Sequence, residues 1–153
     1  MVPSLAGQYA PYIAKELREF QTGVRTHQIM SDLAKTINDA ELNDIAIFFA
    51  SQKMMKGNGK GNNPVGKKLF LKGDPARKIP SCESCHGVNG KGQGPRISTY
   101  PVIGGQHKDY LVSQLVNWRN GERSNSPGNI MNTFAKPLTD AEIDALADYL
   151  AGL

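Results

Sequence analysis

Long apolar runs are missing from this chain of 153 residues: no stretch approaches the roughly 18 residues that a membrane-spanning helix requires. Aromatic residues make up only 7% of the chain, whereas glycine and proline contribute 16 and 9 residues. Loops must therefore carry much of the mass, and the core that side chains can build is thin for this length. A multi-span membrane protein is excluded, and a bound cofactor could supply the missing apolar bulk.

Cysteine is scarce as well. The only two, Cys82 and Cys85, are followed at once by His86. This C-x-x-C-H spacing is typical of c-type haem attachment, in which two thiols form thioether links and the adjacent imidazole coordinates iron. A structural zinc site needs four ligands, and beyond this motif only His27 and His107 remain. A thioredoxin-like dithiol requires a βαβ setting, which is absent, and a plain disulfide would leave the histidine unexplained.

Acidic residues are almost absent from residues 51–80, which hold eight bases and a single acid, Asp74. The bases are Lys53, Lys56, Lys60, Lys67, Lys68, Lys72, Arg77 and Lys78. Such a patch suits an acidic protein or an anionic surface, and it is also what a solvated basic linker looks like. Aromatic residues do not alternate with these lysines, which weakens nucleic acid as a partner.

The chain repeats itself. Residues 3–25 recur 98 positions later as residues 101–123, and after a three-residue insertion residues 30–46 recur 101 positions later as residues 131–147. We therefore expect two related modules. Between them, residues 51–63 are rich in glycine, asparagine and lysine, which predicts an exposed linker. Two methionines of this segment are interpreted as packing residues at a domain junction: Met54 and Met55.

Helical periodicity is clearest at the end of each module. Thr139 to Glu142 form a capping box, as do Asn38 to Glu41, and each box is followed by apolar residues at helical spacing. These apolar residues are Ile143, Leu146, Ala147 and Leu150, and in the first copy Leu42, Ile45, Ala46 and Phe49. A second helix is expected in each copy, with Leu111, Leu115 and Trp118, or Ile13, Leu17 and Phe20, on one face. No alternating strand pattern competes, so the prediction is an all-α fold with long loops.

A haem that transfers electrons also needs a sixth iron ligand. Methionine thioether is soft and raises the reduction potential. Met131 is expected in a loop between the two helices of its module, 45 residues after His86. It follows a stretch of glycine, serine, asparagine and proline and is the only methionine in that module. A lone methionine is more often a core gap-filler, but this position favours Met131 as the ligand, and Met30 takes the equivalent place in the first module.

These motifs together resemble class I cytochromes c, and more narrowly the dihaem cytochrome c4 family. The resemblance rests on Cys82 to Gly87, Tyr100 to Gln106, Tyr110 to Leu115, Gly121 to Arg123, Met131 and Ala147 to Leu150. It implies a cytochrome c fold in which His86 and Met131 are the axial ligands, and in which the Pro101 carbonyl accepts a hydrogen bond from the imidazole; the alternative for Pro101 is a simple turn residue. It also implies that the first helix of the haem domain crosses the last, with Gly66 and Phe70 against Leu146 and Tyr149.

The first module departs from the family pattern. It keeps Met30, Ile45 and Phe48 in matching places, but it has no C-x-x-C-H and no preceding helix. Three interpretations are open: the chain is a fragment of a longer dihaem protein, the module has lost its haem, or a separate piece supplies the missing part. We favour the fragment. Residues 1–50 are then the C-terminal portion of a first haem domain, residues 51–63 a basic linker, and residues 64–153 a complete c-type haem domain, with exposed apolar surface expected on the first part.

The resemblance implies an electron shuttle rather than an enzyme. The shuttle would carry one covalent haem c on this chain, and a full-length protein would carry a second haem with Met30 as its possible axial ligand. Its expected partners are a bc1-type complex as electron donor and a terminal oxidase as acceptor. The alternative is the cytochrome subunit of a dehydrogenase such as sulfide-oxidising flavocytochrome c. Because haem attachment takes place outside the cytoplasm, we expect a periplasmic protein with peripheral membrane contact at most. Residues 1–20 contain no signal peptide pattern, so a signal is absent or already removed.

Overall fold

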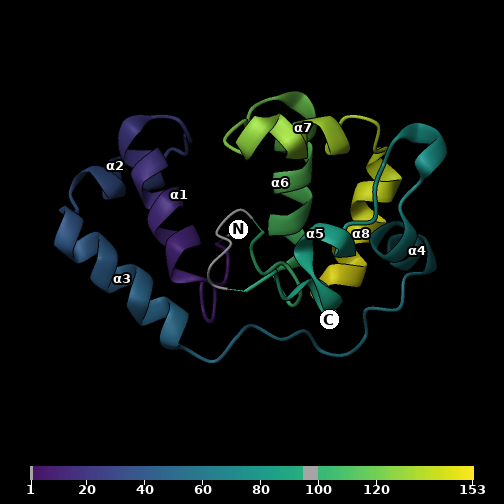
Figure 1. The fold of residues 1–153 in the computed structure, drawn as a ribbon, viewed down its shortest axis with the longest axis horizontal. Coiled ribbons are helices and arrows are strands. Elements are labelled where there is room, and N and C mark those ends of the chain that lie inside the picture. The colour runs from purple at the N-terminus through teal and green to yellow at the C-terminus, as the bar shows by residue number, and fades with distance from the viewer. Residues whose placement is uncertain (1, 95–99) are drawn as a thin grey trace.

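The computed structural model describes residues 2–94 and 100–153, and within these ranges it is built of helices without strands. The helices are α1 Ala10–Thr22, α2 Met30–Lys35, α3 Asp39–Ser51, α4 Pro64–Lys72, α5 Glu83–His86, α6 Lys108–Asn120, α7 Ile130–Ala135 and α8 Asp140–Ala151 (Figure 1). Single 3-10 turns occupy Pro75–Arg77, Val88–Gly90 and Pro127–Asn129. None of the helices described is long and apolar enough to cross a membrane. The all-α prediction is confirmed.

Each half of the molecule contains three helices that correspond to each other in the repeat. In Figure 1, α1 to α3 form the left half and α6 to α8 belong to the right half, which also holds α4 and α5. Both predicted capping boxes are present, since Asn38 and Thr139 each accept a hydrogen bond from the backbone N–H of the glutamate three residues on. Helices α1 and α6 both end at a glycine in the left-handed conformation, Gly23 and Gly121, which side chains rarely adopt.

The core of the right half is built where α4 crosses α8. Helix α4 begins at Pro64 because Asn63 caps it, accepting hydrogen bonds from the next free N–H groups. The crossing is close at Gly66, where an added Cβ would lie 2.0 Å from the carbonyl oxygen of Ala145. The rings of Phe70 and Tyr149 pack beside it with their centroids 5.6 Å apart. The helix crossing that the sequence implies is therefore present.

The left half has a smaller core and an uncovered face. Leu42 and Ala46 of α3 are buried against α1, but Phe48 on the same helix is 58% exposed. Its counterpart in the repeat, Tyr149, is only 6% exposed because α4 covers it. Within the described residues, α3 has no helix corresponding to α4 packed on it, and its outer face remains apolar and open.

Residues 51–63 have the exposure expected of the predicted linker. Most of their side chains are exposed, but the backbone is held in place: Met55 N–H donates to Ala6 O, and Gly57 and Gly59 donate to the last two residues of the chain. Met55 itself is buried, which confirms its packing role at the junction. Gly57 allows the close approach, since a Cβ there would lie 2.3 Å from the backbone of Gly152. Backbone pairing of this kind leaves no trace in composition.

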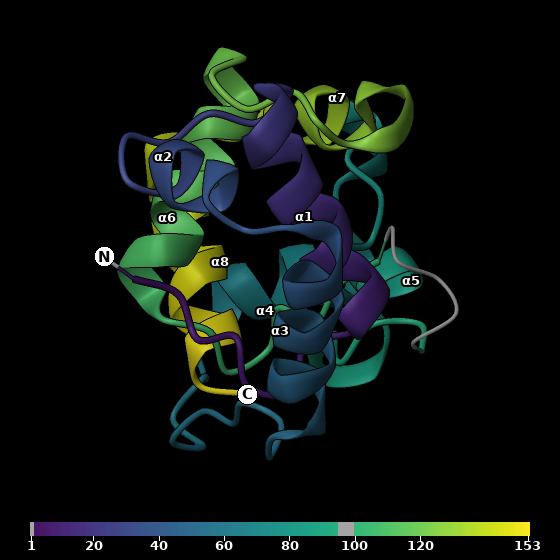
Figure 2. The ribbon, with the colours of Figure 1, turned by 90° about the vertical axis from the view of Figure 1, so that its left-hand side faces the viewer.

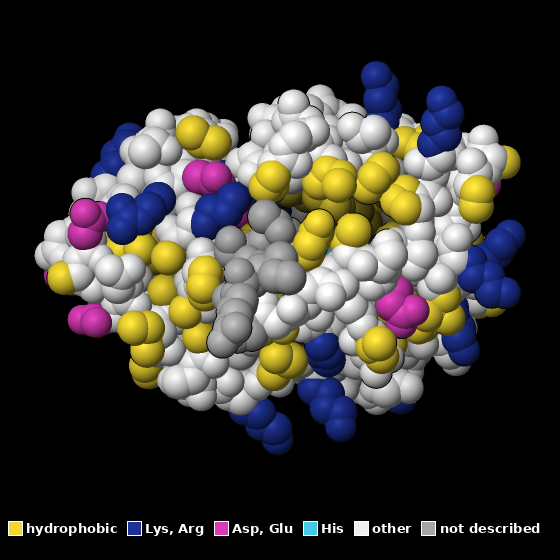
Figure 3. Space-filling model, in the orientation of Figure 1, with side chains coloured by type: hydrophobic (Ala, Val, Ile, Leu, Met, Phe, Trp, Pro, Cys, Tyr) yellow, Lys and Arg dark blue, Asp and Glu magenta, His cyan; other side chains and the backbone are white. Residues whose placement is uncertain are grey.

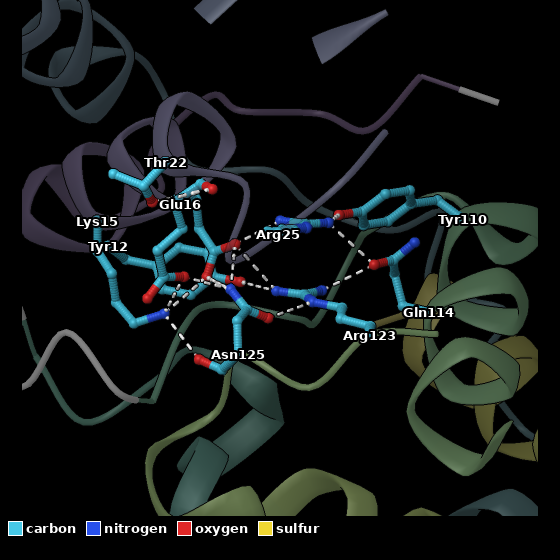
Figure 4. Close-up of polar contacts among 10 residues, drawn as sticks. Tyr12, Lys15, Glu16, Thr22, Arg25, Tyr110, Gln114, Arg123 and Asn125 are labelled. Carbon is cyan, nitrogen blue, oxygen red and sulfur yellow. Dashed lines mark hydrogen bonds and ion pairs between the residues drawn. The ribbon is translucent and has the colours of Figure 1, made fainter. Parts of the chain in front are cut away.

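Reciprocal contacts join the two halves. The Gln8 side chain donates to Val102 O (2.8 Å) and accepts from Val102 N–H (3.0 Å). Gln106, its repeat counterpart, makes the same two bonds with Ser4, each of 2.8 Å. Seen from the side in Figure 2, α1 and α3 stand in front of α6 and α8. Between α1 and α6 lies a group of polar side chains that we call the interface cluster: Tyr12, Glu16, Arg25, Tyr110, Gln114, Arg123 and Asn125 (Figure 4).

Candidate functional site

A hollow with apolar walls opens in the right half. It encloses about 690 Å³ when its open mouth is included, and its lining is almost entirely apolar. Figure 3 shows hydrophobic side chains around it on the face toward the viewer. Its lining residues are Ile79, Pro80, Ser81, Cys82, Cys85, His86, Tyr100, Leu115, Ser126, Ile130, Met131, Phe134, Ala135, Leu138 and Leu146. The two cysteines, the histidine and the methionine singled out in the sequence therefore share one cavity.

His86 is the last residue of the single-turn helix α5 and is buried. Its Nδ1 lies 3.0 Å from the carbonyl oxygen of Pro101, and because a carbonyl only accepts, Nδ1 carries the proton and Nε2 is left with a free lone pair. Burial lowers the pKa of the imidazole, and the Pro101 carbonyl offsets part of this effect. The ring is thus held neutral and fixed in orientation, which is the state that a metal ligand requires.

Cys82 directly precedes α5 and Cys85 lies within it, and both line the cavity. Both are half-buried free thiols, so they do not form a disulfide with each other. Burial raises the pKa of Cys82 to about 11, which keeps the thiol protonated. A reactive redox thiol has a lowered pKa, so this environment disfavours dithiol chemistry and favours a thiol next to an apolar group.

Met131 lines the cavity from α7, whereas His86 lines it from α5. In Figure 1, α7 lies above α5. The expectation that Met131 sits in a loop is wrong: it is the second residue of α7. The 3-10 turn just before α7 contains Gly128 and Asn129 in left-handed conformations, and Met131 N–H donates to Ser126 Oγ over 3.1 Å.

Two residues that the sequence analysis did not identify hold the start of α7, where Met131 lies. Ser126 accepts the Met131 N–H, and Asn132 donates to the backbone oxygens of Trp118 and Arg123, 2.7 Å each. The Ser-Pro sequence at residues 126–127 is a turn signal that could have located the first. Nothing in the sequence marks Asn132, because its partners become neighbours only after folding.

Half of a similar lining exists in the left half. Met30 begins α2 and is partly buried against the α1–α3 core. The repeat matches several cavity residues of the right half to residues of the left: Leu17, Ile29, Met30, Leu33, Ala34, Ile37 and Ile45. Ile29 and Leu33 are more than half exposed, and among the described residues no element corresponding to α5 faces them.

The basic segment lies on the surface. Lys53, Lys56, Lys60 and the three lysines of α4 are exposed. Figure 3 shows Lys and Arg side chains standing out around the edge of the molecule, away from the apolar hollow. Arg77 differs from the lysines, because it is paired with Asp74 and Glu142.

Haem c fits the cavity on three observations. The walls are apolar, two thiols three positions apart in the sequence belong to them, and a neutral imidazole and a thioether belong to the same lining. Cys82 and Cys85 would hold a bound haem covalently, and His86 and Met131 would be its candidate iron ligands. The haem would supply a one-electron iron couple. With both axial positions filled, no open site for a substrate would remain.

Comparisons with known proteins agree with this geometry. Residues 65–153 match the family model "Cytochrome c". Cytochrome c4 of Pseudomonas aeruginosa is 38% identical over 99% of this chain and 75% of its own length, and a thiosulfate dehydrogenase electron acceptor of Stutzerimonas stutzeri is 35% identical over 99% and 70%. The crystal structure of reduced recombinant cytochrome c4 from Pseudomonas stutzeri superposes with a TM-score of 0.90 at 33% identity, covering 99% of this chain and 84% of that one. The chain belongs to the cytochrome c family and, within it, to the cytochrome c4 proteins, which are electron carriers with covalent haem c and not enzymes.

Proposed function

We propose that this chain carries its electron on a haem attached through Cys82 and Cys85 and coordinated by His86 and Met131. The observation that carries the proposal is that all four side chains line one apolar cavity, with the imidazole contributed by α5 and the thioether by α7. The Pro101 carbonyl keeps the imidazole ring oriented by accepting a hydrogen bond from its Nδ1–H. The apolar walls exclude water, and the soft thioether favours the reduced state of the metal.

Replacing Met131 tests the methionine side of the site. In Met131→Ala we expect a lower reduction potential and ready binding of added ligands such as imidazole, because the sixth position is vacated. Met54→Ala is the matched control, since Met54 lies outside the cavity lining and should leave the potential unchanged. An unaltered spectrum and potential in Met131→Ala would eliminate Met131 as a ligand.

We further propose that residues 1–50 are the C-terminal part of a first haem domain, with Met30 as the possible axial ligand of its haem. Two observations support this: the left half repeats the lining of the haem cavity, and its apolar face at Ile29, Leu33 and Phe48 is uncovered. Residues 51–63 then join this part to the complete haem domain, residues 64–153. Intact mass with haem quantitation should give one haem on this 153-residue chain and two on a longer chain that supplies another C-x-x-C-H.

Hydrogen exchange tests the same proposal independently. Amides of residues 42–49 in α3 should exchange much faster than those of residues 143–150 in α8, because the outer face of α3 is open. Strong protection across residues 42–49 in a monomer with one haem and no added peptide would contradict the proposal.

The partners of this electron carrier are redox proteins, and we propose a bc1-type donor and a terminal oxidase acceptor. The exposed lysines of α4, Lys67, Lys68 and Lys72, suit docking to an acidic partner. Lys68→Glu should then slow reduction by the bc1 complex at low salt and have little effect at high salt. Equal rates for the two proteins at low salt would exclude this face from docking.

A dehydrogenase-linked role is the second candidate. The 35% identical relative from Stutzerimonas stutzeri is named a thiosulfate dehydrogenase electron acceptor. The flavocytochrome c alternative belongs to the same class of function, in which the cytochrome drains a dehydrogenase. Rates of reduction by a purified thiosulfate dehydrogenase and by a bc1 complex, measured side by side, decide between the two candidates.

We propose a periplasmic location. Covalent attachment of haem to a C-x-x-C-H motif supports it, because this chemistry takes place outside the cytoplasm. Cell fractionation should recover the holoprotein with the periplasmic contents, and recovery mainly from the cytoplasm would refute the proposal.

A further inference from the structure

A buried carboxylate from the left half lies at the centre of the interface cluster. Glu16 of α1 is 7% exposed, and its Oε2 accepts hydrogen bonds from Arg25 Nη1 (2.5 Å), Asn125 Nδ2 (3.0 Å) and Arg123 Nη2 (3.2 Å) (Figure 4). Arg25 comes from the same half, whereas Arg123 and Asn125 come from the half that holds the haem cavity. One carboxylate therefore ties the two halves together.

The residues of the interface cluster occupy corresponding positions in the two repeats, but their charges differ. Arg25 and Arg123 are repeat counterparts, and each reaches across to a tyrosine of the other half. Glu16 corresponds in the repeat to Gln114, which accepts from both arginines. Burial by itself would raise the pKa of Glu16, but the attraction of Arg123, Arg25 and Lys15 outweighs it and lowers the pKa. Glu16 is thus the ionised centre that two guanidinium groups share.

The contacts of Glu16 lead directly to the methionine side of the cavity. The Asn125 side chain donates to both oxygens of Glu16, and the Asn125 carbonyl oxygen accepts from Lys15 Nζ at 3.1 Å. The next residue, Ser126, accepts the backbone N–H of Met131. Helix α1 of the left half therefore holds the loop of residues 121–129 at the point from which Met131 is positioned.

A second set of contacts connects the 121–129 loop and α7 to the interface cluster. Asn132, the residue after Met131, donates to the carbonyl oxygen of Arg123, whose guanidinium reaches Glu16 and stacks over the Trp118 ring with 4.3 Å to the centroid. Two residues of the 121–129 loop, Arg123 and Asn125, are therefore bonded to the same carboxylate, and α7 is bonded to the first of them.

The corresponding loop of the left half lacks this arrangement. Arg25 is held by Glu16, Tyr110 and Gln114, and His27 Nδ1 accepts the backbone N–H of Met30, but residues 26–28 are exposed and none of them bonds to Glu16 as Asn125 does. Among the described residues, the connection from Glu16 through Asn125 to Ser126 therefore has no equivalent on the side of Met30.

We propose that Glu16 is a positioning residue for Met131: together with Asn125 it fixes the loop of residues 121–129, so that one half of the molecule stabilises the iron ligand of the other. The proposal rests on the ligation of iron by Met131. A thioether is a weakly held ligand, and an untethered loop would more often swing it away from the iron. The expected consequence of losing the tie is a larger population with an open sixth position.

The experiment compares ferric and ferrous holoprotein of the wild type, Asn125→Ala and Glu16→Gln. The readouts are the thioether-to-ferric-iron absorption band, the reduction potential and the affinity for added imidazole. In Asn125→Ala we expect a weaker band, a lower potential and about tenfold tighter imidazole binding, which is the order of effect of one hydrogen bond to a charged group. Asn125→Ala leaves both arginines paired with Glu16, so it should fold even if Glu16→Gln does not.

Gln106→Ala is the matched control. Gln106 is a buried interface residue that binds the backbone of Ser4 on the other half, and none of its hydrogen bonds goes to the 121–129 loop or to Pro101. It should lower thermal stability while leaving the band and the imidazole affinity as in the wild type. The proposal is overturned if Asn125→Ala behaves like the wild type, or if Gln106→Ala opens the iron equally. A wild-type protein without the thioether band would overturn the ligation by Met131 itself, and the positioning role with it.

Discussion

Replacing Gly66 by alanine sets two opposing effects against each other at the α4–α8 crossing. Helix propensity favours alanine in a helix by about 1 kcal/mol. Against this, the new Cβ would lie 2.0 Å from the carbonyl oxygen of Ala145 and 2.9 Å from the Cβ of Tyr149, whereas carbon and oxygen normally stay above about 3.3 Å. The helices would have to separate by about 1 Å, which also loosens Phe70 against Tyr149.

Overpacking of this kind costs about 1 to 3 kcal/mol and more where backbone must move, so we expect a net loss of about 2 kcal/mol. If the chain of 153 residues unfolds as one unit, that loss corresponds to a fall in Tm of about 4 to 8 °C. Thermal unfolding of the ferric holoprotein, followed by circular dichroism, measures it. Lys68→Ala on the exposed face of the same helix is the control and should change Tm by less than about 2 °C. A rise in Tm for Gly66→Ala would refute the close helix contact.

The remaining predictions concern the two repeats, one ion pair and one helix cap. Tyr149→Ala should cost about 3 to 5 kcal/mol in denaturant unfolding, whereas Phe48→Ala, at a matching but exposed position, should cost less than about 1; equal costs would mean that Phe48 is covered. The hydrogen bond from Arg77 lowers the pKa of Glu142 to about 2, so its stabilisation is present above pH 4.5 and is lost as the pH falls toward 2. In Arg77→Ala the decline of Tm between pH 4.5 and pH 2 should be smaller than in the wild type. An unchanged profile of Tm against pH would show that the Arg77–Glu142 ion pair does not stabilise the fold. Asn63→Ala should destabilise by about 1 kcal/mol through loss of the α4 cap, with Asn63→Asp restoring it.

The features that could be predicted from sequence are those whose signal is local or repeated. The C-x-x-C-H motif identifies the haem attachment site because two thiols and an imidazole at that spacing suit few other purposes. Capping boxes located α3 and α8, and the repeat between the halves indicated that α1 corresponds to α6. Gly66 was matched to the helix crossing through the family resemblance, and its close contact with Ala145 is what the structure adds.

Features that depend on distant contacts could not be predicted in this way. Helix α7 has only six residues, too few for a periodic apolar pattern, so Met131 was expected in a loop. Residues 51–63 have the composition of a linker, yet hydrogen bonds to the chain end fix their backbone. Arg25 and Arg123 were visible as members of the repeat, but their shared partner Glu16 is a neighbour of Arg123 only after the halves have packed.

The reciprocal bonds of Gln8 and Gln106 give the interface the character of a two-fold dimer contact, in which the same patch meets its own copy. In a true homodimer every substitution would appear on both sides of the axis, so the centre would hold either two carboxylates or two amides. Joining the copies in one chain removes that constraint. Glu16 and Gln114 use this freedom, since they place a single negative charge beside two arginines, an arrangement that identical subunits could not reach.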